Sequence, residues 1–353
     1  MRSQVSKTIL IACYFYLGAI SAMNVLAVGG QEVRDGHHNL QGTWQLTGGE
    51  KGGKSFPDAA AKDVQIIFND GQMTTRNGKN EFTFPFTLLP DETPSGIDLT
   101  MNESVGKGIF RLEGIQLTIV HTEAGEPRPT TFATSEGSKL TMLVLEKVPS
   151  KIHFATNDGG EIVANIYGTG ESAVLLAHGG RFNKESWSRQ ARELSTVGFQ
   201  VMAIDFRGYG QSRGPGQEEV LSAPLHLDIL AGVSYLRTNG AKIVSVVGAS
   251  MGGSAAAAAV AEKPNAIDRL VLLGSTPSCP AKDLNCPKLY IMTSDDTSGS
   301  GPRLPALLRH FEQVPGPKEL MIPSGSSHAQ FMFDDTIGHR VMADIIRFLS
   351  EPN

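Results

Sequence analysis

The stretch IVSVVGASMGGSAAAAAV, from Ile243 to Val260, decides the fold of this chain. It begins with apolar, β-branched residues, passes through a serine that is flanked by glycines, and continues into a run of alanines. β-Branched residues favour strands and alanine favours helices. The stretch therefore predicts a buried strand, a sharp turn and a helix in direct succession.

The turn itself has the pattern Gly248-x-Ser250-x-Gly252, which is typical of a nucleophile elbow. Glycines on both sides let the strand and the helix approach each other, and they leave Ser250 exposed at the carboxyl end of the strand. The amides that begin the helix favour negative charge at that point. The pattern alone also fits a plain glycine-rich turn, so a catalytic interpretation depends on partners elsewhere in the chain.

A serine nucleophile needs a base. Where the serine lies in a nucleophile elbow, the order along the chain is serine, acid, histidine. Three histidines follow Ser250. His310 and His339 fall in segments with a helical pattern, whereas His328 lies in the loop sequence PSGSSHAQF after an apolar strand. We therefore predict His328 as the general base.

Two neighbouring carboxylates are candidates for the acid that orients this histidine. Asp295 and Asp296 both follow the apolar strand of KLYIMTSDDTSG. We predict Asp296, the residue farther into the turn, as the catalytic acid. Asp295 remains the alternative, with a capping or turn role if it is not used.

Backbone amides are expected to stabilise the oxyanion of an acyl-transfer reaction. One candidate is the N–H of Met251, the residue after the nucleophile. The other comes from the turn that ends AVLLAHGG, at Gly180 or Arg181. His178 in the same turn precedes Ser250 along the chain and is expected to be a structural hydrogen-bonding residue.

The chain changes character near Pro149. Residues 39–148 contain short apolar or alternating runs separated by turn residues, which predicts an antiparallel all-β domain, either a barrel or a sandwich. Residues 151–353 alternate apolar strands with longer helical patterns, which predicts a mostly parallel sheet with helices on both faces.

The N-terminus predicts export. Arg2 and Lys7 precede a long apolar run, as in a secretory signal peptide. We expect residues 1–27 to be removed after Ala27, with cleavage near Ala22 or an uncleaved membrane anchor as alternatives. The mature protein is then secreted or periplasmic and has no membrane span.

Cysteine usage fits such a compartment, since Cys279 and Cys286 would remain as a pair and are candidates for a disulfide.

The composition limits the classes of partner. The net charge is −5, and no basic stripe indicates a nucleic-acid-binding protein. Two cysteines without a nearby histidine make a poor metal site. Neither a metal nor an organic cofactor is expected, because the predicted serine, acid and histidine supply the nucleophile, the base and the electrostatics by themselves. The sequence leaves the oligomeric state open.

Residues 151–350 resemble the α/β-hydrolase superfamily, because LLAHGG, DFRGYGQS, GASMGG, TSDDT and SSHAQF stand in that order. The resemblance is greatest to small esterases, dienelactone-hydrolase-like proteins and serine-aminopeptidase-like proteins. It implies a Ser250–Asp296–His328 triad that cleaves a small carboxylic ester through an acyl-enzyme. A peptidase or amidase with the same triad, acting on a short peptide, and a non-catalytic binding protein on this scaffold are the alternatives.

The N-terminal segments also resemble a known domain. LQGTWQLTGGEKGGK, PSGIDLT, GIFRLEGIQLTI and RPTTFAT are similar to a lipocalin-like domain of planctomycete-type bacterial proteins. This resemblance implies a β-barrel for residues 39–148 and gives no activity.

Overall fold

The computed structural model describes residues 40–57, 61–101, 103–220 and 222–351. The predicted signal peptide, residues 1–27, lies outside this part of the chain. The chain divides between Val148 and Pro149 into two compact units, which are described separately below.

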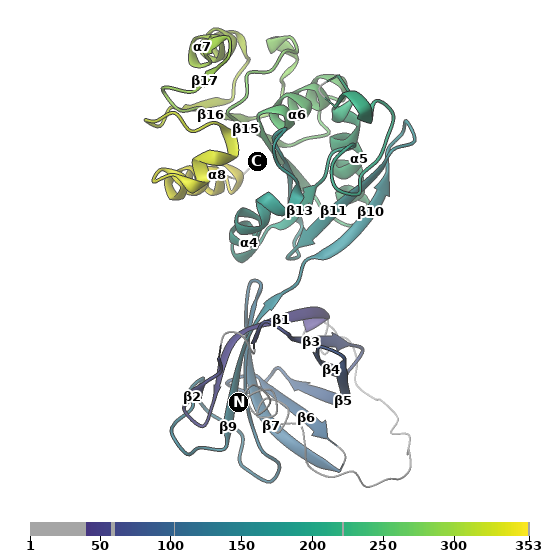
Figure 1. Cartoon of the computed structure of the whole chain (residues 1–353), viewed down its shortest axis with the longest axis vertical. Coiled ribbons are helices and arrows are strands. Elements are labelled where there is room, and N and C mark those ends of the chain that lie inside the picture. The colour runs from purple at the N-terminus through teal and green to yellow at the C-terminus, as the bar shows by residue number, and fades with distance from the viewer. Residues whose placement is uncertain (1–39, 58–60, 102, 221, 352–353) are drawn as a thin grey trace. The chain divides into compact units, whose positions relative to one another are not determined.

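The N-terminal unit is an antiparallel sheet that closes on itself (Figure 1). The short strand β2 pairs only with β1, which also pairs with β3. From β3 to β9 each strand pairs with the next along the chain, and β9 returns to pair with β1, Trp44 opposite Lys147. The strands are β1 (Gly42–Lys51), β2 (Lys54–Ser55), β3 (Val64–Asn69), β4 (Gln72–Asn77), β5 (Asn80–Leu89), β6 (Gly96–Met101), β7 (Ser104–Glu113), β8 (Gln116–Thr122) and β9 (Leu140–Lys147). The structure thus confirms an all-β unit and shows a barrel-like closure rather than two separate sheets.

Side chains fill the interior of this barrel. Alternate residues along β3 are buried, namely Val64, Ile66 and Phe68, as expected for a strand with one face in a core. Trp44 is also buried, and its indole N–H donates to the carbonyl of Leu40. The cavity that remains has a volume of about 70 Å³, well below the roughly 300 Å³ at the lower end of ordinary ligand sites. The lipocalin-like resemblance itself stays a prediction.

The C-terminal unit contains an eight-stranded sheet in the order β10-β11-β13-β12-β14-β15-β16-β19. The first two pairings are antiparallel, and every pairing from β13 to β19 is parallel. The strands are β10 (Ser150–Ala155), β11 (Glu161–Tyr167), β12 (Ser172–Ala177), β13 (Gln200–Ile204), β14 (Ile243–Ala249), β15 (Arg269–Leu273), β16 (Lys288–Ile291) and β19 (Lys318–Met321).

Helices cover both faces of this sheet (Figure 1). They are α4 (Ser188–Thr196), α5 (Leu225–Thr238), α6 (Met251–Glu262), α7 (Leu304–Gln313) and α8 (Gly338–Leu349). Successive strand residues point to opposite faces: Leu175 and Val246 pack with α5 and α6, whereas Leu176 and Val247 pack with α4 and α8. This burial on both faces explains why the central strands are apolar throughout.

Candidate active site

Ser250 lies in a strained turn between β14 and α6. Its φ of 49° and ψ of −111° are rare for a residue with a side chain. The two flanking glycines make this turn sterically feasible. A Cβ on Gly248 would lie 2.6 Å from the carbonyl oxygen of Gly252, and a Cβ on Gly252 would lie 2.3 Å from that of Ala177. The glycines are therefore required by backbone contacts on both sides of the serine.

The structure brings Ser250, His328 and Asp296 together in one chain of hydrogen bonds. The Oγ of Ser250 is 2.8 Å from Nε2 of His328, and Nδ1 of the same ring is 2.7 Å from Oδ2 of Asp296. Ser250 follows β14, Asp296 follows β16 and His328 follows β19. These strands are parallel, and their carboxyl ends meet at one edge of the sheet. Asp296 is buried, whereas the imidazole is partly exposed. The ring can therefore accept a proton from the serine while the carboxylate holds its other nitrogen.

The other sequence candidates lie elsewhere. Asp295 accepts a hydrogen bond from the hydroxyl of Ser294 at 2.9 Å and makes no contact with the imidazole. His310 lies on α7, where its Nε2 is 3.1 Å from the hydroxyl of Tyr290. His339 lies on α8, where it is exposed to solvent.

Two side chains that the sequence analysis did not single out hold the histidine loop. The buried Gln330 accepts the N–H of Gly179 at 2.8 Å and donates to the hydroxyl of Ser186 at 2.7 Å. The buried Thr293 donates its hydroxyl to the carbonyl of Ser327, next to His328, at 3.0 Å. These contacts tie the histidine loop to the turn after β12 and to the acid turn. The sequence marks Gln330 and Thr293 only by their positions, which lie close to those of His328 and Asp296.

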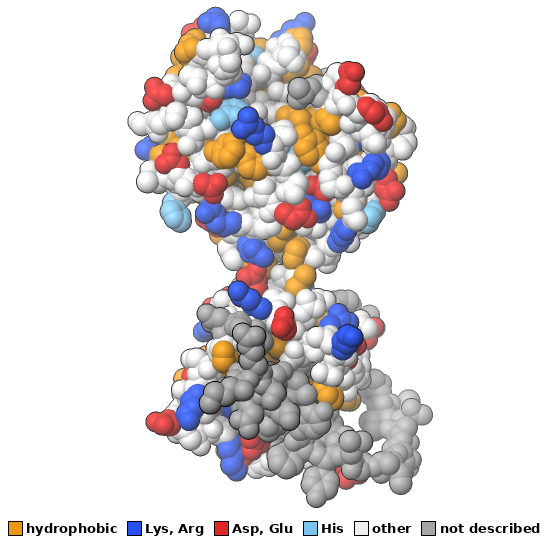
Figure 2. All heavy atoms as spheres, viewed as in Figure 1, with side chains coloured by type: hydrophobic (Ala, Val, Ile, Leu, Met, Phe, Trp, Pro, Cys, Tyr) orange, Lys and Arg blue, Asp and Glu red, His pale blue; other side chains and the backbone are white. Residues whose placement is uncertain are grey.

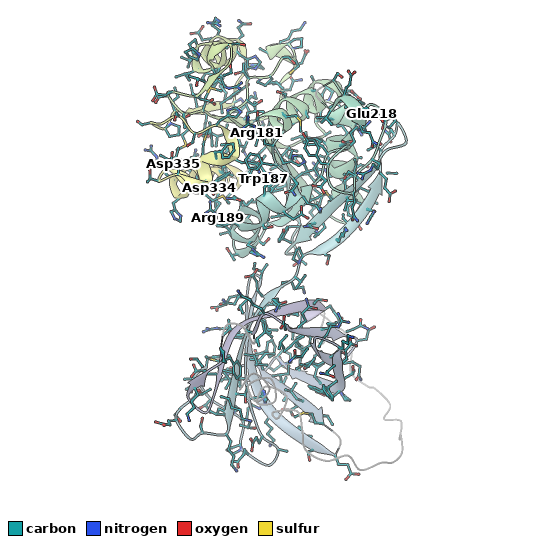
Figure 3. The ribbon with its side chains drawn as sticks, viewed as in Figure 1. Arg181, Trp187, Arg189, Glu218, Asp334 and Asp335 are labelled. Atoms are coloured by element: carbon teal, nitrogen blue, oxygen red, sulfur yellow. The ribbon has the colours of Figure 1, made fainter. Side chains whose placement is uncertain are left out.

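The predicted oxyanion donors lie around the nucleophile. Met251 is the first residue of α6, so its N–H has no partner within the helix. The turn after β12 packs against the elbow: a Cβ on Gly179 would lie 3.5 Å from Cβ of Ser250, and one on Gly180 would lie 3.7 Å from Sδ of Met251. Arg181, the next residue, is exposed on the C-terminal unit, near the middle of the upper part of Figure 3. The amide of Gly179 is already used by Gln330, which leaves those of Gly180 and Arg181 as the donors from this turn.

An aromatic pair borders the same turn. The rings of Phe182 and Phe331 lie 4.9 Å apart, and Phe331 is 43% exposed. Phe182 also approaches the position beside Ser250. Figure 2 shows hydrophobic side chains gathered in the middle of this face of the C-terminal unit.

Two buried polar side chains near the turn after β12 have structural roles. His178 accepts the N–H of Phe206 through Nε2 at 3.2 Å, and burial lowers the pKa of the ring. Asp205 accepts both the N–H and the ammonium group of Lys184, at 2.8 and 2.6 Å. Neither side chain is hydrogen-bonded to the nucleophile, and both fix the turns that carry the site.

Arg207 forms a second buried network beside these turns. Its fully buried guanidinium lies between the carboxylates of Asp228 and Asp158. Arg207 lowers the pKa of Asp158 to about 2, whereas burial raises the pKa of Asp228. An arginine between two carboxylates satisfies several donors at once.

A cavity of about 730 Å³ opens beside Ser250. Its walls come from α5, α6, the segment after β15, the hairpin of β17 (Thr297–Ser298) and β18 (Gly301–Pro302), and α7. The segment between β15 and β16 is short and holds only the 3₁₀ turn η3 (Ala281–Asp283), so no helical cap separates these strands. A volume of this size accommodates a small organic substrate.

Comparison with known structures identifies the scaffold of this site. An esterase from Pyrococcus furiosus, Pf2001, superposes with a TM-score of 0.50 over 57% of this chain and 92% of that protein, at 19% identity. Residues 172–314 also match the family described as the alpha/beta hydrolase fold. The C-terminal unit has the α/β-hydrolase fold. The fold class predicted from the sequence is thereby confirmed.

The curated proteins similar to this chain include hydrolases and esterases. A 2-hydroxy-6-oxononadienedioate/2-hydroxy-6-oxononatrienedioate hydrolase of Burkholderia vietnamiensis is 31% identical over 155 residues, 42% of this chain and 52% of that protein. A pimeloyl-[acyl-carrier protein] methyl ester esterase of Sodalis glossinidius is 33% identical over 117 residues, 31% of this chain and 39% of that protein. The chain thus spans about half, or less, of the length of these relatives.

The predicted disulfide of the hydrolase unit is absent. Cys279 and Cys286 are both free, and both side chains pack on the hydrophobic cluster beneath α5 and α6. Burial raises the pKa of both thiols, that of Cys286 to about 11. Disulfide formation needs a thiolate, so this environment disfavours the bridge, and the prediction from cysteine spacing was wrong.

Within residues 40–57, 61–101, 103–220 and 222–351, no group of three or more His, Cys, Asp or Glu side chains could hold a metal ion. Over the same ranges, no helix is long and apolar enough to cross a bilayer.

Proposed function

We propose that this protein is a serine hydrolase that cleaves carboxylic esters. The observation that carries the proposal is the continuous contact from Ser250 through His328 to Asp296, at 2.8 and 2.7 Å. A serine hydroxyl is a weak nucleophile unless a base accepts its proton, and this geometry provides both the base and the acid that orients it. The esterases among proteins of similar fold and sequence support the same reaction class.

The reaction proceeds in two halves. Ser250 Oγ attacks the ester carbonyl while its proton passes to Nε2 of His328, and Asp296 stabilises the resulting imidazolium. The C–O bond to the alcohol then breaks, and the imidazolium returns the proton to the leaving oxygen. Water, deprotonated by the same imidazole, attacks the acyl-enzyme. The bond from the acyl carbon to Ser250 Oγ then breaks, the imidazolium returns the proton to Oγ, and the carboxylic acid leaves.

The oxyanion of each tetrahedral intermediate is assigned to backbone amides. In this proposal the N–H of Met251 and that of Gly180 or Arg181 donate to the charge that develops beside Ser250 Oγ. Removing one such donor in a serine hydrolase costs about 10²- to 10³-fold in kcat. The start of α6 adds a favourable dipole at the same point.

The cavity favours an ester over a peptide with a free amino terminus. Among the residues described, those that line the cavity include no Asp or Glu, the side chains that would bind an ammonium group. The peptidase or amidase alternative therefore lacks a recognition element here. The binding-protein alternative would predict a lost or displaced triad residue, and all three side chains lie in contact.

Active-site labelling tests the proposal. A fluorophosphonate probe should label the wild-type protein at Ser250 and should not label Ser250→Ala. Ser254→Ala, which removes a neighbouring hydroxyl that lines the same cavity, is the matched control and should still be labelled. The proposal fails if Ser250→Ala hydrolyses p-nitrophenyl butyrate at the wild-type rate, or if a panel of aminoacyl anilides is cleaved faster than esters.

We further propose that the protein is exported, on the basis of the basic and apolar N-terminal sequence alone. Fractionation of cells that express the full chain tests this proposal. A mature protein that begins near Val28 in the periplasm or medium would support cleavage after Ala27, whereas a full-length cytoplasmic protein would contradict export.

A further inference from the structure

The cavity beside Ser250 carries positive charge on one wall. Arg303 precedes α7 and Arg309 lies on it, and both side chains line the cavity. The third basic residue of the lining, His226, is 2.7 Å from Glu262, so an acidic neighbour already compensates it. The two arginines therefore set the sign of the local field.

Neither arginine is fully neutralised by the described part of the chain. Nε of Arg303 lies 3.3 Å from Oδ1 of Asp296, in a geometry that is not a hydrogen bond. The carboxylate also serves His328, and the terminal nitrogens of the guanidinium have no acceptor among the described residues. Arg309 is exposed and makes no ion pair with any residue in the described ranges. Arg303 and Arg309 thus have guanidinium nitrogens without an acceptor among the described residues, and both side chains line the cavity that Ser250 also lines.

The rest of the lining consists largely of hydroxyl groups and small apolar side chains. The hydroxyls belong to Ser250, Ser254, Ser275, Thr276, Ser278, Ser298 and Ser300. Hydroxyl donors and planar guanidinium groups are the usual partners of a carboxylate in proteins. A purely apolar acyl chain would leave these groups unpaired, which costs binding energy.

We propose that the preferred substrate is an anionic ester, whose carboxylate binds Arg303 and Arg309 while Ser250 attacks the ester carbonyl. This inference rests on the proposed function, because it names the substrate class of the same site. The simplest such substrate is a monoester of a dicarboxylic acid. Its second carboxylate would lie at the α7 end of the cavity, beyond the hairpin that follows Asp296. The top of Figure 1 shows α7 and β17 together at this end.

Matched pairs of esters test the acyl side and the alcohol side separately. On the acyl side, p-nitrophenyl adipate is compared with p-nitrophenyl 6-methylheptanoate, in which an isopropyl group replaces the carboxylate. On the alcohol side, 3-acetoxybenzoate is compared with 3-acetoxybenzamide. In one of the two pairs, we expect kcat/KM for the anionic ester to exceed that for its neutral partner by about tenfold. This is the size expected for a single charge-assisted contact. The advantage should shrink with added salt, because ions screen a partly exposed pair.

Three variants show whether the arginines cause the preference. Arg309→Gln and Arg303→Lys should each reduce the ratio of anionic to neutral kcat/KM several-fold. Arg340→Gln is the control, because Arg340 is an exposed arginine of α8 outside the cavity lining. Binding of adipate to the wild-type protein and the variants, measured by calorimetry, gives a readout that does not depend on turnover. It should weaken in the two cavity variants and not in the control.

The outcomes separate this inference from the proposed function. If neutral and anionic esters are hydrolysed equally and adipate binding does not depend on Arg303 or Arg309, the anionic-substrate inference is wrong and the esterase proposal stands. If no ester is hydrolysed but adipate binds through these arginines, the anion site stands and the esterase proposal is wrong.

Discussion

Replacing Asp296 by Asn should remove most of the activity, for a reason that depends on Arg303. In the proposed mechanism the carboxylate, 2.7 Å from Nδ1 of His328, stabilises the imidazolium in the transition state. Two unit charges about 4 Å apart attract by about 4 kcal/mol at an effective dielectric constant near 20. At 1.36 kcal/mol for each factor of ten, the loss of this attraction alone would lower kcat by about 10³-fold.

The orientation of the new amide increases the loss. In the wild type, Oδ1 of Asp296 faces Nε of Arg303 at 3.3 Å, and Oδ2 faces His328. An asparagine would turn its oxygen toward the arginine, because two N–H donors cannot face each other. Its NH₂ group would then donate to Nδ1 of His328, so the ring would carry its own proton on Nε2. A protonated Nε2 cannot accept the proton of Ser250. We therefore expect a total loss near 10⁴-fold, the size found for this tautomer change in serine proteases.

The assay is kcat on one neutral ester across pH 5–9, with circular dichroism as a check of folding. Asp295→Asn is the matched control, because Asp295 is the adjacent carboxylate and its side chain accepts a hydrogen bond from Ser294; its kcat should fall less than threefold. The double variant Asp296→Asn/Arg303→Met should regain part of the activity, since the amide can then offer its oxygen to His328. The reasoning is refuted if Asp295→Asn is the more damaging change, or if removing Arg303 leaves the Asp296→Asn loss unaltered.

Four other perturbations test the surrounding structure. Gln330→Met should lower kcat by about 10- to 100-fold through misplacement of the reacting groups, with KM and the thermal midpoint little changed; a drop in stability alone would contradict a positioning role. Arg207→Met should lower the free energy of unfolding by about 3–5 kcal/mol, measured by urea denaturation, because Asp228 would remain buried without its partner. Gly252→Ala should cost about 1–3 kcal/mol in the same assay, because the new Cβ would lie 2.3 Å from a carbonyl oxygen of β12. The pKa of Asp158 is about 2, below its ordinary value of 3.8, so its stabilising contribution is complete above pH 3.8 and is lost as the pH falls through 2. The stability difference between wild type and Asp158→Asn should accordingly shrink between pH 4 and pH 2, and a constant difference would be inconsistent with the depressed pKa.

The elements that sequence reasoning placed best are those fixed by local sterics and strand order. The elbow follows from Gly248 and Gly252, whose missing side chains are required by backbone contacts on both sides. The meeting of Ser250 with His328 follows from the rule that residues after parallel strands share one edge of the sheet. The same rule could not choose between Asp295 and Asp296, because both follow the same strand and only the folded turn determines which carboxylate faces the ring.

Other features depend on tertiary contacts that no local pattern encodes. Gln330 acts through Gly179, which is 151 positions away in the chain, and Arg303 lies in no motif. The closure of the N-terminal sheet depends on pairing between β1 and β9, so the strand pattern alone left barrel and sandwich open, and only the lipocalin-like resemblance favoured a barrel. The disulfide prediction failed because spacing reports nearness along the chain, whereas bond formation also depends on the environment of each thiol.

Arg303 links the chemistry of this site to its selectivity. The hairpin that begins directly after Asp296 carries the chain to Arg303, and the backbone N–H of Arg303 returns to the carbonyl oxygen of Asp296 at 2.9 Å. The hairpin is therefore anchored on the acid at both ends, and any shift of the cavity wall that it forms moves the partner of the catalytic histidine. An anion bound by Arg303 would draw the guanidinium away from Asp296 and leave more of the carboxylate charge for the imidazolium. Substrate binding would then help to stabilise the imidazolium that forms in the transition state, so that the substrate carboxylate should increase kcat as well as lower KM.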